Sequence, residues 1–97
     1  TDIHLASPDK VETFKEYTEL YTIQPESVLY MGDDIPDYHV MQLVGLPTCP
    51  QDASPEIKAI SKYISHKNGG KGAVRDVIEQ VMKVQGKWHL YYNGKHD

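Results

Sequence analysis

Cysteine, tryptophan and phenylalanine each occur only once in this chain. The single thiol, Cys49, cannot form an internal disulfide, so we expect a cytoplasmic protein rather than a secreted domain held by disulfides. Basic residues are also few, with 10 Lys and Arg against 14 Asp and Glu, and no basic stripe indicates a nucleic-acid surface. No apolar run approaches the roughly 18 residues of a membrane span. We therefore expect neither nucleic acid nor a membrane as partner.

The 97 residues fit one domain or part of one, and 39% hydrophobic with 25% charged residues is ordinary for a globular protein. The sequence begins at Thr1, without an initiator methionine or a signal peptide. Its first segment, DIHLA at residues 2–6, has the character of a strand from the middle of a sheet. We therefore expect these residues to be the C-terminal part of a longer protein.

Strand-like and helix-like segments alternate along the chain, which predicts an α/β fold with a Rossmann-like parallel sheet and flanking helices. The expected strands are residues 2–6, 28–31, 46–49 and 62–65, and the expected helices are residues 9–21, 37–44, 55–60 and 73–85. Ser7 and Pro8 favour the start of the first helix, and Gly86 the end of the last. Residues 89–97 show no helix or strand pattern, so we divide the chain into a domain at 1–88 and a tail at 89–97.

Helical spacing of apolar residues predicts which face of each long helix is buried. For the first helix the predicted face is Val11, Phe14, Thr18 and Tyr21. For the last helix it is Val74, Val77, Ile78, Val81 and Val84. Both helices are therefore expected to pack on the sheet.

Three carboxylates follow the apolar strand 28–31 within a few positions. Gly32 allows a sharp turn after the strand, and Asp33, Asp34 and Asp37 come next. Ligands of open α/β sheets bind beyond the C-terminal ends of the strands, and clustered carboxylates repel one another unless a cation lies between them. Hard oxygen ligands suit Mg²⁺. The alternative is an ordinary Asp-rich turn in which Asp37 caps the following helix.

A lysine stands at the matching place after the first expected strand. Lys10 lies in the first turn of the helix that follows residues 2–6. If that strand neighbours residues 28–31, Lys10 and Asp33 reach the same edge of the sheet, where an ammonium group can contact a phosphate and offset the acidic charge. The alternative is a solvated lysine on an amphipathic helix.

The segment NGGKGAVRD places glycines just before a helix, as phosphate-binding loops do. Gly69, Gly70 and Arg75 are therefore candidates for contact with a substrate or with another subunit. The spacing matches neither the P-loop pattern nor the dinucleotide pattern. The alternative is a tight strand-to-helix link, with Arg75 on the surface of the last helix. None of the five histidines pairs with another His or Cys at zinc-ligand spacing.

Together these motifs resemble the C-terminal half of the 3-deoxy-D-manno-octulosonate 8-phosphate phosphatases, a family of the haloacid dehalogenase superfamily. The resemblance rests on DK opening a helix, then VLYMGDDIPDYHVM, VGLPTCPQDASPEIKAISKYIS and NGGKGAVRDVIEQVMKVQGKW. It covers most of residues 2–88, and the GGKGAVRD block with the final QGKW narrows it to this family. Residues 1–88 are thus interpreted as part of a haloacid dehalogenase-like hydrolase domain.

The resemblance implies Mg²⁺-dependent hydrolysis of a sugar-acid phosphate used in lipopolysaccharide precursor synthesis. In the family an aspartate attacks phosphorus and water cleaves the aspartyl-phosphate. Asp33 matches the family's magnesium ligand, Lys10 matches the lysine that contacts nucleophile and phosphate, and Gly32, Asp34 and Asp37 match the supporting acidic loop. The resemblance also implies a homotetramer in which C-terminal segments approach a neighbour's active site.

The nucleophile itself is missing from this sequence. The family carries it in a D-x-D motif at the end of its first strand, and nothing before Asp9 supplies that motif. The arginines that grip the substrate also lie upstream in the family. We therefore expect the 97-residue chain alone to be inactive.

Two other functions remain open from the sequence. One is a non-catalytic oligomerisation module of the same fold, as in the C-terminal domain of some sialic-acid-activating synthetases. The other is a phosphoaccepting receiver domain, which would need its acidic pair near the N-terminus rather than at Asp33 and Asp34.

Overall fold

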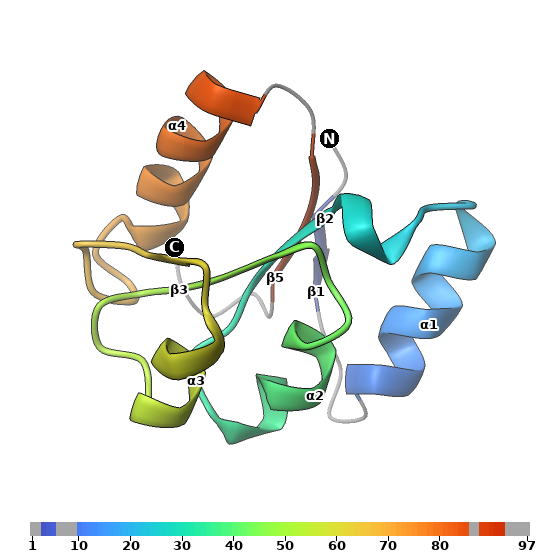
Figure 1. Cartoon of the computed structure of the whole chain (residues 1–97), viewed down its shortest axis with the longest axis horizontal. Helices are drawn as coiled ribbons and strands as arrows, with labels where there is room; N and C mark the ends of the chain where they lie inside the picture. Colours follow the sequence, from blue (N-terminus) through green and yellow to red (C-terminus); the bar gives the residue numbers. More distant parts are fainter. Residues whose placement is uncertain (1–2, 6–9, 86–87, 93–97) are drawn as a thin grey trace.

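A computed structural model describes residues 3–5, 10–85 and 88–92 (Figure 1). Its strands are β1 (Ile3–Leu5), β2 (Val28–Met31), β3 (Leu46–Cys49), β4 (Tyr63–Ile64) and β5 (His89–Tyr92). Its helices are α1 (Lys10–Leu20), α2 (Tyr38–Met41), α3 (Pro55–Ile60) and α4 (Ala73–Gln85), with short 3-10 helices at Pro25–Ser27 and Ile35–Asp37. The predicted alternation of strands and helices is confirmed.

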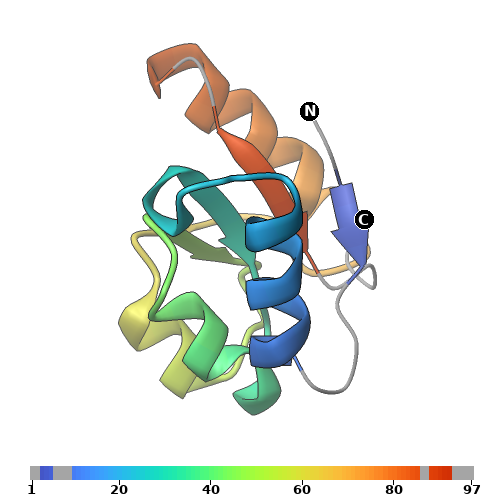
Figure 2. The ribbon, with the colours of Figure 1, turned by 90° about the vertical axis from the view of Figure 1, so that its right-hand side faces the viewer.

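All five strands of the sheet run parallel, in the order β1-β5-β2-β3-β4. The last strand in the sequence therefore lies between the first and the second (Figure 2). Tyr92 at the end of β5 is paired with Leu5 on one side and with Met31 on the other. Because parallel strands end at one edge, the C-terminal ends of β1, β2 and β5 lie side by side at the same edge of the sheet.

Helices cover the sheet on both faces, as Figure 1 shows. Residues of α1, α2 and α3 pack with Tyr30 and Tyr91 on one face, whereas residues of α4 pack with Leu29, Met31 and Leu90 on the other. The side chains of β2 are consequently buried along its whole length. This explains why β2 is apolar throughout rather than alternating.

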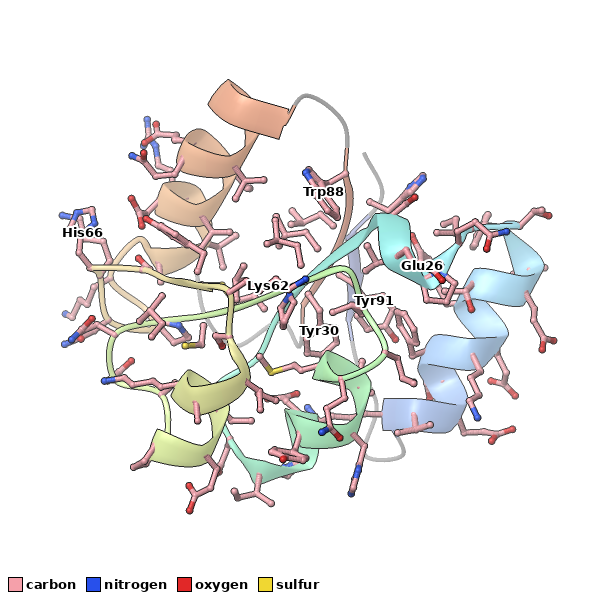
Figure 3. The ribbon with its side chains drawn as sticks, viewed as in Figure 1. Glu26, Tyr30, Lys62, His66, Trp88 and Tyr91 are labelled. Atoms are coloured by element: carbon pink, nitrogen blue, oxygen red, sulfur yellow. The ribbon has the colours of Figure 1, made fainter. Side chains whose placement is uncertain are left out.

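An aromatic cluster joins β5 to the rest of the core. The ring of Tyr91 stacks on that of Tyr30, with centroids 5.3 Å apart (Figure 3). It also meets Phe14 and Tyr17 of α1 edge to face, each with centroids 5.2 Å away. Tyr30, Tyr91 and Phe14 are among the largest fully buried side chains, so β5 contributes directly to the main core.

The structure corrects two predictions. Residues 89–97 were expected to form a tail without regular structure, yet His89–Tyr92 form a central strand. Tyr21 was expected on the buried face of α1 but is 55% exposed, because the helix ends at Leu20 and Tyr17 takes the core position. The predictions for Ser7, Pro8, Gly86 and the side chain of Val84 lie outside the described residues.

Candidate functional site

Asp37 lies at the centre of the acidic loop and is almost fully buried, with 1% of its surface exposed. Its Oδ1 accepts a hydrogen bond from the hydroxyl of Tyr30 at 2.7 Å and lies 3.0 Å from Nζ of Lys10. Its Oδ2 accepts the backbone N–H groups of Asp33 at 2.9 Å and Asp34 at 3.3 Å. Both oxygens of Asp37 are thus used within the protein.

Gly32 makes this arrangement possible. A Cβ atom at that position would lie 2.6 Å from Cβ of Asp37 and 2.7 Å from the sulfur of Met41. Any side chain there would push Asp37 away from the backbone N–H groups that it accepts. The glycine of the motif is therefore required for close approach, which a sequence reading can only express as a preference for a turn.

The contacts of Asp37 keep it ionised despite its burial. Burial alone raises the pKa of a carboxyl, but the backbone N–H of Asp33, the Tyr30 hydroxyl and the Lys10 ammonium hold the pKa of Asp37 below its usual value. Burial, and next the charge of Asp37, raise the pKa of Tyr30, so its hydroxyl stays protonated and donates a hydrogen bond to the carboxylate. The Asp37 carboxylate and the Lys10 ammonium group thus form an ion pair whose opposite charges compensate each other inside the protein.

Asp34, rather than Asp37, caps the chain after the loop. The Asp34 side chain accepts the N–H of Ile35 at 2.8 Å and forms a capping box with Asp37 at the short helix Ile35–Asp37. At the start of α2, the Asp37 side chain makes no capping hydrogen bond. The alternative in which Asp37 merely caps the next helix is therefore not what the geometry shows.

Asp33 is half-buried at the mouth of the loop and is held through its backbone. Its N–H points to Asp37, and its carbonyl oxygen accepts the N–H of Ser54 at 2.9 Å. Since Asp37 has both oxygens occupied, Asp33 and the exposed Asp34 are the carboxylates of this loop that suit a hard cation such as Mg²⁺. Within the described ranges no group of three or more acidic, His or Cys side chains is placed to hold a metal ion. Two carboxylates of suitable chemistry are present, and a cation bound between them would need further ligands.

Lys10 lies beside the acidic loop as predicted, although the strand pairing on which that prediction depended is absent from the sheet. Strand β1 is not a neighbour of β2, because β5 lies between them. Helix α1 starts at Lys10 and packs on the sheet so that the ammonium group meets Asp37 rather than Asp33. The structure therefore brings together Lys10, Gly32, Asp33, Asp34 and Asp37.

The glycine-rich loop lies near the same edge. Its Gly69 N–H donates to Oδ1 of Asp52 at 2.8 Å, and its Lys67 carbonyl accepts the N–H of Gln51 at 2.8 Å. Residues 51–54 in turn contact the acidic loop through the bond between Ser54 and Asp33. Gly69 and Gly70 thus belong to loops linked at one edge of the sheet.

Arg75 lies on the surface of the last helix, which is the alternative that the sequence left open for it. Its guanidinium lies 3.4 Å from Glu79 one turn later on α4, and its side chain is 81% exposed. The ion pair between Arg75 and Glu79 is therefore a surface contact, and such contacts contribute little to stability.

Sequence reasoning missed two buried polar contacts, that of Tyr30 in the site and that of Asp76 at the start of α4. Tyr30 donates to Asp37, although its place in an apolar strand indicates only burial. Asp76, at the start of α4, accepts hydrogen bonds from Tyr63 at 2.8 Å and Ser65 at 2.7 Å and lies 3.4 Å from His66. The signal for the first was a tyrosine in an otherwise aliphatic strand. The signal for the second was an acidic residue in the first turn of a helix.

Comparison with known proteins places these motifs in context. The haloacid dehalogenase-like hydrolase family matches residues 1–78. A 3-deoxy-D-manno-octulosonate 8-phosphate phosphatase from Salmonella typhi is 39% identical over 87 residues, which is 88% of this chain and 46% of that protein. This chain therefore spans about half the length of the relatives that it matches.

Solved structures of such phosphatases share the fold. The enzyme from Yersinia pestis superposes with a TM-score of 0.75 at 35% identity, over 87% of this chain and 48% of that one. The enzyme from Moraxella catarrhalis, in complex with magnesium ion, phosphate ion and KDO molecule, superposes with a TM-score of 0.77 at 33% identity, over 81% and 45%. Among the described helices, none combines the length and the apolar character needed to cross a bilayer. With its parallel sheet, its acidic loop and a family match over most of its residues, this chain belongs to the haloacid dehalogenase-like hydrolases.

Proposed function

We propose that this chain supplies half of the active site of a Mg²⁺-dependent phosphatase acting on a sugar-acid phosphate of the 3-deoxy-D-manno-octulosonate 8-phosphate type. The observation that carries the proposal is the ion pair between Lys10 and Asp37, whose carboxylate also accepts the backbone N–H of Asp33. The relatives at 35–39% identity bear the name of that phosphatase. The nucleophile comes from a D-x-D segment outside these 97 residues.

Each residue of the corner has a distinct task in this proposal. Asp33, with Asp34 beside it, offers oxygen ligands to Mg²⁺, which when bound neutralises charge on the transferring phosphoryl group. Lys10 presents an ammonium group to a phosphate oxygen. Asp37 is a positioning residue, because it holds Lys10 and fixes the backbone of Asp33 while its own oxygens are occupied.

The second candidate is a non-catalytic module of the same fold that serves oligomerisation. It is favoured by the fact that the described part of the chain holds no complete metal site. The homotetramer implied by the resemblance and the cytoplasmic location inferred from the single cysteine stay predictions.

The test uses the longer protein in which a D-x-D segment precedes this chain. We expect Asp33→Ala to reduce Mg²⁺-dependent phosphate release at least about 100-fold, since changes to residues that merely support metal ligands already cost roughly 10- to 100-fold. Glu19→Ala, which removes an exposed carboxylate from the far end of α1, is the matched control and should leave turnover unchanged.

Two results would contradict the proposal. Full turnover in Asp33→Ala would refute its role as a metal ligand. Phosphate release by the 97-residue chain alone would show that the nucleophile lies within it. An inactive longer protein that still assembles into a defined oligomer would favour the non-catalytic module.

A further inference from the structure

One peptide group of the glycine-rich loop (residues 66–72) is held at both of its ends. The N–H of Gly69 donates to Oδ1 of Asp52 at 2.8 Å, and the carbonyl oxygen of Asn68 accepts the N–H of Lys71 at 3.0 Å. That N–H and that carbonyl belong to the same planar peptide group, so they can turn only together. Rotation of the plane between Asn68 and Gly69 therefore breaks both hydrogen bonds.

The residue before Asn68 is anchored as well. The N–H of Lys67 donates to Oγ of Ser65 at 3.0 Å, and the carbonyl oxygen of Lys67 accepts the N–H of Gln51 at 2.8 Å. Ser65 is itself buried and donates to Asp76 at 2.7 Å. The backbone on both sides of Asn68 is thus fixed, although Asn68 itself is exposed to water.

An asparagine followed by glycine can lose its side-chain amide without an enzyme. The backbone nitrogen of the glycine attacks the side-chain carbonyl carbon, and the new C–N bond closes a cyclic imide. The old bond from that carbon to Nδ2 breaks, and Nδ2 leaves as ammonia with the proton of the backbone nitrogen. Water then opens the imide at either carbonyl, which gives aspartate or isoaspartate. Glycine favours the attack because it has no Cβ and adopts a wide range of backbone angles.

We propose that Asn68 is a site of spontaneous deamidation, and that Asp52 controls the reaction by holding the Gly69 N–H away from the Asn68 side chain. The attacking nitrogen must turn the direction of its N–H bond toward the side-chain carbonyl carbon of Asn68. In the structure that direction is occupied by Oδ1 of Asp52. The amide is therefore protected while the loop is attached to residues 51 and 52, and it reacts when the loop detaches.

The reaction also prevents the loop from returning. The imide has no N–H at position 69, so it cannot donate a hydrogen bond to Asp52. Isoaspartate at position 68 lengthens the backbone by one carbon, which displaces the Gly69 N–H from the carboxylate that accepts it. Aspartate at position 68 places a second carboxylate near Asp52, and like charges repel.

The test follows deamidation of the folded 97-residue chain at neutral pH by peptide mapping and mass spectrometry. The mapping separates Asn68 from the other Asn-Gly pair of the sequence, at residues 93 and 94. The same chain unfolded in urea gives the unprotected rate at Asn68. We expect Asn68 to react at least about tenfold more slowly in the folded chain. A hydrogen bond to a charged acceptor is worth more than the roughly 1.4 kcal/mol that a tenfold change represents.

Asp52→Ala should remove most of this protection in the folded chain. Asp52→Asn keeps an uncharged acceptor oxygen and should accelerate the reaction less, and it is the variant to use if Asp52→Ala does not fold. Glu56→Ala removes an exposed carboxylate from the start of α3 and is the matched control. Its rate at Asn68 should equal that of the wild type.

Equal rates at Asn68 in the folded chain and in urea would overturn the proposal, as would an unchanged rate in both Asp52 variants. An acceleration by Glu56→Ala as large as that by Asp52→Ala would also overturn it, because any nearby negative charge would then slow the reaction. In converted chains the N–H of Gln51, which donates to Lys67, should exchange with solvent faster than in unconverted chains. Unchanged protection of that N–H would show that the loop stays attached after deamidation and would contradict the proposed detachment.

Discussion

At the scale of single residues, Asp37 shows how a charge is kept in a protein interior. Its carboxylate receives two backbone N–H groups, one hydroxyl and one ammonium group. Removing any one of these donors leaves part of a buried charge without compensation, which costs more than the intact pair contributes. The acidic loop is therefore built around the residue that is least able to bind a metal.

Asp37→Asn is expected to lower the free energy of unfolding by about 3 kcal/mol at neutral pH, because Lys10 then faces an uncharged amide. Urea unfolding followed by circular dichroism measures the loss. Glu19→Gln, on the exposed surface of α1, is the control and should stay within about 0.5 kcal/mol of the wild type.

The same variant has a defined pH dependence. The pKa of Asp37 is lowered in the folded state, whereas an unfolded aspartate titrates near about 3.9. The stabilisation is therefore complete above that pH and is lost as the pH falls through the lower folded pKa. The stability difference between wild type and Asp37→Asn should narrow below about pH 4. A difference that stays constant down to full acid unfolding would be inconsistent with an ionised Asp37.

A second residue-scale prediction concerns the Asp76 cluster. Burial, followed by the hydrogen bond and charge of Asp76, raises the pKa of Tyr63 to about 12. Asp76→Asn removes the charge but not the burial, so the pKa of Tyr63 should move toward its usual value of about 10. Titration of the Tyr63 ring by NMR measures it. Ser65→Ala leaves the charge in place, so a fall as large as that of Asp76→Asn would point away from electrostatics.

How far the sequence predicts the site follows from how local each contact is. The acidic residues and Lys10 are identified by a contiguous motif and a helix start, and the structure brings them to one corner. The tyrosine in the otherwise aliphatic strand β2 suggests a polar contact, but the sequence does not identify Asp37 as the partner, because every side chain of this strand is buried and none is marked by alternation. Which acidic residue pairs with Lys10 depends on the angle at which α1 crosses the sheet, and that angle has no local sequence signature.

At the scale of elements, the turn between α2 and β3 packs tightly, backbone against backbone, on the segment before β2. The N–H of Gly45 donates to the Pro25 carbonyl at 3.1 Å, and a Cβ on Gly45 would overlap the carbonyl oxygen of Glu26. The close contact is between two stretches of backbone, so neither side can move aside independently. This contact of Gly45 with Pro25 and Glu26 fixes where β3 starts beside β2.

Gly45→Ala should therefore destabilise the protein by about 2–3 kcal/mol, the usual cost of forcing extra atoms into a packed contact. Gly70→Ala is the matched control: Gly70 has a positive φ of 76° but open space around its Cβ, so only backbone strain of about 1 kcal/mol is expected. Denaturant midpoints of the two variants give the comparison. Equal losses would mean that the contact of Gly45 is not tight in solution.

Most elements were predictable because each has its own local pattern. Strand β2 and helices α3 and α4 coincide with the predicted residues 28–31, 55–60 and 73–85. Strand β5 was not predicted, because WHLYYN mixes polar and aromatic residues without a clear period. Its strand conformation depends on pairing with β1 and β2, which are distant in sequence.

At the scale of the whole molecule, Tyr91 and Tyr21 differ sharply in how far their side chains are buried. Tyr91 is fully buried among three aromatic rings, whereas Tyr21 is 55% exposed. Tyr91→Ala should cost about 3–5 kcal/mol, a large part of the 5–15 kcal/mol of a typical domain. Tyr21→Ala should cost less than about 1 kcal/mol. Thermal unfolding of both variants, monitored by near-ultraviolet circular dichroism, tests whether β5 belongs to the cooperative core.

The place of β5 also bears on how the chain folds. The strand that joins β1 to β2 comes after all the other elements in the sequence, and Ile3 pairs with Leu90. Within this sequence the four other described strands therefore precede the one that connects β1 to β2, and β1 has no described pairing partner until β5 forms. Contacts between such distant residues close large loops, which slows folding. Refolding should accordingly show β2, β3 and β4 protected from hydrogen exchange before β1.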